Sequence, residues 1–234
     1  LHRVDRRQRQ MCIRDRAIVG PSGCGKSTLL SMLCGLTLPE GGTINIDGVP
    51  LTKSPSAIGY MLQKDHLFEW RNIFSNISLG LEIQKRLDEP ARQELLEMMA
   101  AYGLAGFEYA KPSELSGGMR QRAALIRTLA LKPDLLLLDE PFSALDYQTR
   151  LSVCDDISSI IRQTHKTAIL VTHDLSEAIS VADRILILSP RPGRVKKILS
   201  IDFPKMCTRS LDRRNCPEFS AYFNMVWKEL KTYE

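Results

Sequence analysis

Residues 20–27 read GPSGCGKS and directly follow the short apolar run Ala17–Val19. The stretch meets the pattern G-x-x-x-x-G-K-[ST] at every position. Glycines tolerate a positive φ, so successive backbone N–H groups can converge on phosphate oxygens. Lys26–Cys34 has a helical pattern that Gly35 is placed to end, and the N-terminus of such a helix attracts anions. The stretch therefore predicts a strand, a phosphate-binding loop and a helix, in that order.

The residues of this loop have different expected roles. Lys26 should reach the β- and γ-phosphates of a nucleotide, and the Ser27 hydroxyl should coordinate Mg²⁺. Cys24 stands at an unrestricted position, and we interpret it as tolerated filler rather than a redox switch. The expected nucleotide-binding residues of the loop are Gly20, Pro21, Ser22, Gly23, Cys24, Gly25, Lys26, Ser27 and Thr28. The loop indicates a nucleotide but not the purpose for which it is bound.

Downstream of the loop, short apolar runs alternate with helical segments, which is the pattern of a parallel sheet wrapped by helices. The expected strands are residues 135–139, 167–172 and 185–189, and the expected helices are residues 151–163 and 175–181. Ile44 and Ile46 alternate with polar neighbours and precede the turn Asp47-Gly48, which predicts a small antiparallel part. The predicted fold class is α/β, with a mostly parallel core sheet.

Two carboxylates follow the apolar run Leu135–Leu138. A buried parallel strand would deliver them to the C-terminal edge of the sheet, where such sheets bind ligands. Asp139 is the expected Mg²⁺ partner, through water, and Glu140 is the candidate to polarise the attacking water. The alternative is an ordinary helix N-cap, since Pro141 follows. Lys26 and Ser27 in the same chain favour the catalytic interpretation.

His173 directly follows the expected strand 167–172, so it should approach the same C-terminal edge of the sheet as Asp139 and Glu140. An imidazole there can bridge the γ-phosphate, the water and the Glu140 carboxylate. A single histidine after a strand is ordinarily structural. Its position relative to the other motifs favours the functional interpretation.

Residues 65–132 lack the strand pattern of the core and predict a helical lobe inserted within it. One helix is expected over Pro90–Tyr102, and we expect its methionines to serve packing. A second helix should begin at Ser116-Gly117-Gly118 and run to about Lys132. Ser116 is a natural N-cap, and the exposed start of such a helix is a second anion site. A plain cap would explain Ser116 but not the two glycines, which weaken a helix.

Composition bounds the class of protein. The chain has 234 residues, 44% apolar and 25% charged, which suffices for one sizeable core. No apolar run approaches the ~18 residues that span a bilayer. The net charge of +5 arises almost wholly from residues 1–16, so no nucleic-acid partner is expected. We expect no signal peptide, because the Arg-rich start has no apolar run after it. The sequence has no Cys-x-x-Cys pair, and we expect the six cysteines to be reduced thiols.

Taken one after another, the motifs resemble those of the ATP-binding subunit of ABC transporters, over roughly residues 17–200. The motifs are the phosphate loop, Gln63, the signature Leu115–Arg122 (LSGGMRQR), Asp139-Glu140, Ser143–Asp146 (SALD) and His173. The resemblance implies a P-loop NTPase that binds ATP and Mg²⁺. It implies that two subunits pack head to tail, each signature closing on the nucleotide of the other.

By the same resemblance, Gln63 joins Lys26, Glu140 and His173 in the catalytic set and contacts Mg²⁺ together with Ser27 and Asp139. Gln63, Ser116, Gly117, Gly118 and Asp146 would complete the nucleotide site. Asp146 would lie at the seam of a homodimer.

The stretch after Gln63 narrows the group. QKDHLFEWRNI, residues 63–73, is similar to importers of nitrate, sulfonate and taurine, which commonly show Leu-Leu-Pro-Trp here. Trp70 matches, whereas Phe68 and Glu69 depart; Ser189–Arg194 (SPRPGR) also resembles that group. Such subunits lie at the cytoplasmic face of the cell membrane and serve permease subunits and, indirectly, an extracytoplasmic solute-binding protein. Asp65–Ile77 would receive a permease helix, unless Trp70 is a core residue.

Residues 1–16 depart from the family, in which strands and an adenine-stacking aromatic precede the phosphate loop. We therefore expect this Arg-rich segment to be foreign and the true N-terminal segment to be missing; residues 201–234 form a short tail. Three alternatives stay open: a soluble ABC-type ATPase acting on nucleic acid or ribosomes, an exporter subunit, and a non-catalytic remnant.

Overall fold

The computed structural model describes residues 15–46, 48–51, 58–143, 145–164, 166–204 and 206–231. Asp47 and Ala144 lie outside these ranges. Residues 1–14, most of the segment expected to be foreign, also lie outside them. The strands are β1 (Asp15–Val19), β2 (Asn45–Ile46), β3 (Val49–Pro50), β4 (Ile58–Met61), β5 (Leu135–Asp139), β6 (Thr167–Val171), β7 (Arg184–Leu188) and β8 (Val195–Ser200). The helices are α1 (Lys26–Leu33), α2 (Ile73–Ile83), α3 (Glu89–Ala101), α4 (Gly117–Leu129), α5 (Tyr147–Thr164), α6 (Leu175–Val181), α7 (Ser210–Asn215) and α8 (Pro217–Lys231).

The main sheet has the strand order β4-β5-β6-β1-β7-β8. The pairs β4–β5, β5–β6, β6–β1 and β1–β7 are parallel, and the pair β7–β8 is antiparallel. β2 and β3 form a separate antiparallel pair. The predicted mixture of a mostly parallel core sheet and a small antiparallel part is therefore confirmed. β1 begins at Asp15 and pairs with β6 and β7, so the last two residues of the segment 1–16 belong to a central strand.

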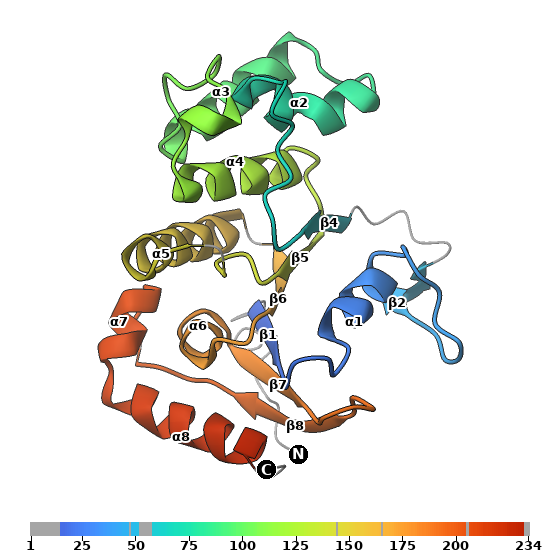
Figure 1. The fold of residues 1–234 in the computed structure, drawn as a ribbon, viewed down its shortest axis with the longest axis vertical. Helices are drawn as coiled ribbons and strands as arrows, with labels where there is room; N and C mark the ends of the chain where they lie inside the picture. The colour runs from blue at the N-terminus through green and yellow to red at the C-terminus, as the bar shows by residue number, and fades with distance from the viewer. Residues whose placement is uncertain are drawn as a thin grey trace, which may run out of the picture.

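Helices cover both faces of the sheet (Figure 1). On one face α1 packs through Leu30, which lies in a buried cluster with Ile18 and Val171. On the other, α6 and α8 pack on β1 and β7, and Val226 of α8 is fully buried in this cluster. The short tail of residues 201–234 thus includes a helix, α8, that packs on the sheet. A parallel strand covered on both faces must be apolar throughout, which is why Ala17–Val19 and Leu135–Leu138 carry no polar residue.

Helices α2, α3 and α4 form a lobe at the top of Figure 1, beyond the β4 end of the sheet. Its core is apolar and includes Ile73, Ile77 and Met99, each fully buried; the predicted packing role of the methionine stripe holds for Met99. The strand β4 contacts α4 closely, because a β-carbon added to Gly59 would lie 2.6 Å from Thr128 Cγ2. Glycine in a strand interior often marks such an approach.

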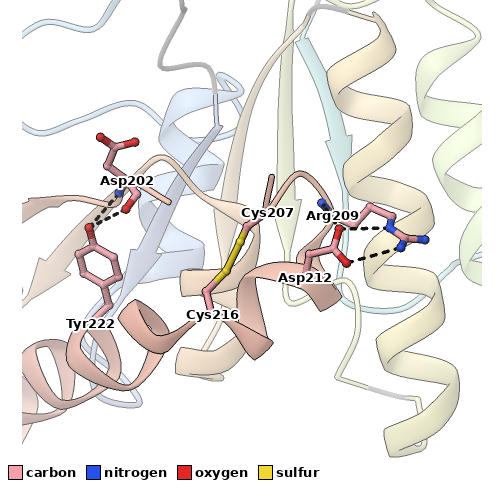
Figure 2. Close-up of a disulfide and its surroundings, with 6 residues drawn as sticks. All are labelled: Asp202, Cys207, Arg209, Asp212, Cys216 and Tyr222. Atoms are coloured by element: carbon pink, nitrogen blue, oxygen red, sulfur yellow. Dashed lines mark hydrogen bonds and ion pairs between the residues drawn. A yellow bond between two sulfur atoms is a disulfide. The ribbon is translucent and has the colours of Figure 1, made fainter. Parts of the chain in front are cut away.

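The expectation that all cysteines are reduced is wrong for two of them. Cys207 and Cys216 form a disulfide, which Figure 2 shows between the Asp202–Tyr222 and Arg209–Asp212 contacts. The two residues flank the short helix α7, whose turns bring them together; their spacing in the sequence does not reveal this. Cys24, Cys34 and Cys154 are free thiols. In the described part of the chain, no helix is long and apolar enough to cross a membrane.

Candidate functional site

The phosphate loop connects β1 to α1 as predicted. Gly23 and Gly25 have φ values of 74° and 102°, which an L side chain rarely adopts. The Lys26 side chain is buried within the loop, and its Nζ donates to Gly20 O at 2.8 Å and Pro21 O at 3.0 Å. Exposed residues of the loop and the first turn are Ser22, Gly23, Gly25, Ser27 and Thr28. The loop therefore presents backbone and hydroxyl groups to solvent at the start of a helix.

Cys24 and Gly193 shape the underside of this loop. The Cys24 side chain is buried, and a β-carbon added to Gly20 would lie 2.9 Å from its Sγ. A β-carbon added to Gly193 would lie 2.2 Å from Cys24 O, so the segment Ser189–Arg194 rests against the phosphate loop. The packing agrees with the interpretation of Cys24 as filler. Sequence reasoning missed Gly193 as part of the site, because it gave Ser189–Arg194 only as a resemblance to the importer group.

Asp139 lies at the end of β5 beneath the phosphate loop. Its two carboxylate oxygens accept hydrogen bonds from Ser27 Oγ and from the Tyr60 hydroxyl, both at 3.3 Å. Burial, followed by the charge of Asp139, raises the pKa of Tyr60 to about 12. The hydroxyl and carboxylate are oxygen donors of the kind that Mg²⁺ prefers, so the pair fits that ion. Tyr60 was not anticipated, because its contact with Asp139 depends on β4 pairing with β5.

Glu140 stands between two side chains from different parts of the chain. His173 Nδ1 lies 3.1 Å from Glu140 Oε1, and Gln63 Nε2 donates to Glu140 Oε2 at 3.2 Å. Glu140 has a φ of 45°, a strained value that often marks functional sites, and its N–H donates to Val171 O at 2.8 Å. The backbone turn aims the carboxylate away from the strand and toward both partners.

Gln63 contacts this carboxylate rather than the Ser27–Asp139 pair. Its Nε2 also donates to Ser143 Oγ at 3.2 Å, and Ser143 Oγ donates to Glu140 O at 3.0 Å. The structure therefore brings Gln63, Glu140 and His173 together, and the expected contact of Gln63 with Mg²⁺ stays a prediction.

The signature helix α4 begins in the lobe. Ser116 caps it by accepting a hydrogen bond from Met119 N at 3.3 Å, and Ser116 and Gly117 are exposed. A β-carbon added to Gly118 would lie 2.8 Å from Thr149 Cγ2 on α5. Close helix packing is therefore one reason for the second glycine, which sequence reasoning had assigned to a ligand alone.

Asp146 caps the neighbouring helix α5 and is exposed. Its Oδ1 accepts a hydrogen bond from Thr149 N at 3.1 Å. The hydrogen bonds from Thr149 lower the pKa of Asp146. Asp146 and the start of α4 thus lie near one another, because Gly117 approaches Leu145 and Gly118 approaches Thr149.

Two arginines of α4 hold the glutamine segment, residues 63–69. Arg120 binds both oxygens of Asp65, at 2.8 and 3.1 Å, and Glu69 Oε1 at 2.9 Å. Arg127 donates to the backbone oxygens of Asp65 and His66 at 2.6 and 2.8 Å. Burial alone would raise the pKa of Asp65, but the hydrogen bonds from Arg120 and Leu67 outweigh it and lower that pKa. The segment that carries Gln63 is therefore fastened to the signature helix.

Trp70 is not a core residue, because 74% of it is exposed. Its ring lies 4.7 Å from that of Phe68. Asn76, fully buried on α2, holds the loop beneath them: its Oδ1 accepts from Phe68 N at 2.7 Å, and its Nδ2 donates to Phe68 O at 3.0 Å and Arg71 O at 3.2 Å. The loop therefore displays aromatic side chains on a fixed backbone.

Comparison with known proteins identifies the family to which the chain belongs. Residues 14–143 match the family described as ABC transporter. The chain is 46% identical over 218 residues to the uncharacterized ABC transporter ATP-binding protein YtlC of Bacillus subtilis, covering 93% of this chain and 84% of that protein. It is 44% identical over 186 residues to the taurine import ATP-binding protein TauB of Yersinia pestis, covering 80% and 73%. The chain therefore belongs to the ABC transporter family, as an ATP-hydrolysing subunit.

Solved structures place the fold in the same class. Two structures of the ATP-binding cassette MJ0796 match with TM-scores of 0.68 and 0.69 at 29% identity, covering 82% of this chain and 87% of theirs. Both are described as dimeric, and one contains ADP and Pi in a post-hydrolysis state. The predicted P-loop NTPase fold is confirmed.

Proposed function

We propose that two copies of this chain form a head-to-tail pair that hydrolyses ATP and drives a small-solute importer. The observation that carries the proposal is the division of the site. Asp139, Glu140 and His173 lie on the sheet or directly after its strands, and Lys26 begins α1, which packs on the sheet. The exposed start of the signature helix belongs to the lobe. A second copy would supply Ser116, Gly117 and Gly118 to each nucleotide, with Asp146 at the seam.

Within each copy, residues 20–28 hold the phosphates of ATP. Lys26 exchanges its two loop carbonyls for the β- and γ-phosphate oxygens, which is favourable because the phosphates carry charge. Ser27 and Asp139 hold Mg²⁺, whose charge offsets that of the phosphates. Gln63, whose amide donates to Glu140 in the structure, would be a further oxygen ligand of the same ion.

Glu140 accepts the proton of the water that attacks the γ-phosphorus, and the bond to the β–γ bridging oxygen breaks to give ADP and phosphate. His173 orients the Glu140 carboxylate and contacts the γ-phosphate. The distances of 3.1 Å to His173 and 3.2 Å to Gln63 support this arrangement, because a general base must be held within reach of the water.

The dimer is tested with the Glu140→Gln variant, which keeps the shape of the site and removes the base. We expect turnover to fall by about 10²–10⁴-fold while ATP affinity is retained. Static light scattering should show a monomer that becomes a dimer on addition of ATP and Mg²⁺.

The matched control combines Glu140→Gln with Ser116→Arg, which fills the exposed helix start. This double variant should bind ATP and stay monomeric. A Ser116→Arg chain that dimerises as well as its parent would contradict the head-to-tail pair.

The permease is proposed to dock on the Phe68–Trp70 loop, at the cytoplasmic face of the cell membrane. Exposed aromatic residues on a backbone held by Asn76 support this surface, since aromatic side chains are enriched at interfaces. A pocket lined by Arg71, Phe74, Arg92 and Tyr109 adjoins the loop. An extracytoplasmic solute-binding protein would act through the permease.

The substrate is proposed to be a small solute of the nitrate, sulfonate or taurine type, and 44% identity to TauB supports that class. The test is uptake of labelled taurine by Yersinia pseudotuberculosis cells that lack TauB and express this chain. Uptake should return with the chain and not with its Lys26→Ala variant. A chain that dimerises with ATP yet restores no uptake would exclude taurine-type permeases.

A further inference from the structure

The loop that carries His173 is fastened by a buried carboxylate on α6. Glu177 is 2% exposed, and its Oε2 accepts a hydrogen bond from Thr172 Oγ1 at 2.7 Å. Thr172 Oγ1 in turn accepts from Asp174 N at 3.0 Å. One hydroxyl therefore ties together the residues on either side of His173. We call residues 172–174 the histidine loop.

Arg150 of α5 connects this loop to the chain beside Asp146. Its Nη1 lies 3.5 Å from Asp174 Oδ2, and its Nε lies 3.9 Å from Glu177 Oε1. Its Nη2 donates to Leu145 O at 3.0 Å. A single guanidinium thus contacts the histidine loop, its buried carboxylate and the backbone next to the proposed dimer seam.

His173 depends on this support for its orientation. Its side chain is 59% exposed, against 20% for Glu140, so packing restricts the imidazole little. The hydrogen bonds of Thr172 hold the backbone on either side of His173 and so fix the point from which the imidazole reaches Glu140. Misplacing a catalytic group by about 1 Å can cost about 100-fold in rate.

We propose that Glu177 and Arg150 are positioning residues for ATP hydrolysis, which link the Asp146 end of α5 to the histidine loop through Thr172 and Asp174. A second copy that contacts Asp146 acts on Leu145 O, and Arg150 transmits the displacement to the residues that flank His173. The inference rests on the proposed roles of His173, Glu140 and Asp146 and adds the connection between them.

The main test is Thr172→Val, which keeps the branched shape and removes the hydroxyl. We expect kcat for ATP hydrolysis to fall by about 10- to 100-fold, with KM for ATP unchanged because the phosphate loop is untouched. Thr172→Ser keeps the hydroxyl and should restore kcat.

Ser158→Ala is the matched control, because Ser158 is also buried at 2% exposure and its Oγ donates to Cys154 O at 2.6 Å within α5. It should lose a comparable hydrogen bond and leave kcat unchanged. Arg150→Lys, at a side chain that is 26% exposed, gives a second variant that should fold. The lysine keeps the charge but lacks the guanidinium that contacts both Asp174 and Leu145 O. The variant should lower kcat and leave KM unchanged.

A double-substitution cycle separates positioning from general damage. If Thr172 acts through His173, Thr172→Val should cause no further loss of kcat in a His173→Ala chain. An additive loss, or a Thr172→Val chain with the turnover of the parent, would overturn the inference. If instead the parent chain does not hydrolyse ATP, or His173→Ala has full turnover, the proposed function fails at its own step.

Discussion

The glutamine segment and the histidine loop deliver side chains to the two oxygens of one carboxylate, yet they are anchored in different parts of the molecule. His173 approaches Glu140 Oε1 and Gln63 approaches Oε2. The histidine loop is fastened to α6 through the buried Thr172 and Glu177, and to α5 through Arg150. The glutamine segment is fastened to α4 of the lobe, through side chains of Arg120 and Asp65 that remain 24% and 19% exposed.

The two anchors belong to different layers of the molecule. His173 follows β6 and the phosphate loop follows β1, and these strands are neighbours in the sheet. Gln63 shares its anchor with the signature, because Arg120 lies within Leu115–Arg122. The signature and Gln63 therefore share one anchor in the lobe, whereas His173 is anchored on the sheet side of Glu140.

Asp65→Asn should weaken the anchor of the glutamine segment and leave the anchor of the histidine loop intact. Loss of the charged pair with Arg120 is expected to cost about 1.5–3 kcal/mol of local stability, the range for hydrogen bonds to charged groups. Hydrogen exchange followed by mass spectrometry should show faster exchange in residues 65–71 and no change in residues 172–178.

Glu94→Gln is the matched control, since Glu94 pairs with Lys132 at side chains that are 49% and 64% exposed. Such pairs contribute at most about 1 kcal/mol, so exchange in the glutamine segment should stay unaltered. Equal acceleration in the histidine loop of the Asp65→Asn chain would show that the two anchors are one unit.

The pH dependence of stability should sharpen the comparison, because the two anchoring carboxylates have pKa shifts of opposite sign. The pKa of Asp65 is lowered from 3.8, so its contribution to stability is present above that value and is lost as the pH falls through the folded-state pKa. Burial raises the pKa of Glu177 above 4.5, against the hydrogen bond from Thr172. Its contribution is therefore present below that value and is lost as the pH rises through the folded-state pKa.

Urea unfolding from acid to neutral pH can separate these contributions. Relative to the parent chain, Asp65→Asn should become more destabilising as the pH rises, and Glu177→Gln less so. The effect is the smallest of those expected, since one group changes the unfolding free energy by at most about 1.4 kcal/mol per pH unit. Parallel curves for the parent and Glu177→Gln would contradict the raised pKa of Glu177.

Much of the site was predictable because its residues follow strands. Asp139, Glu140 and His173 come at the ends of apolar runs, and parallel strands end at a common edge. Tyr60 and Gly193 were not predictable, because their roles arise from β4 lying beside β5 and from the β7–β8 connection lying against Cys24. The disulfide was missed for a different reason: Cys207 and Cys216 are only nine residues apart, but their spacing matches no pattern and α7 lies between them.

The sequence by itself determined the class of protein: the phosphate loop, the signature and the acidic pair are local patterns whose spacing defines a P-loop ATPase of the ABC family. The tertiary structure decided how those parts are connected. The clamp of Arg120 and Arg127 on the glutamine segment joins residues more than fifty positions apart, and the contact of Arg150 with Asp174 joins residues 24 apart. Local patterns encode elements and their ends, whereas the pairing of charges between elements depends on how helices and strands pack.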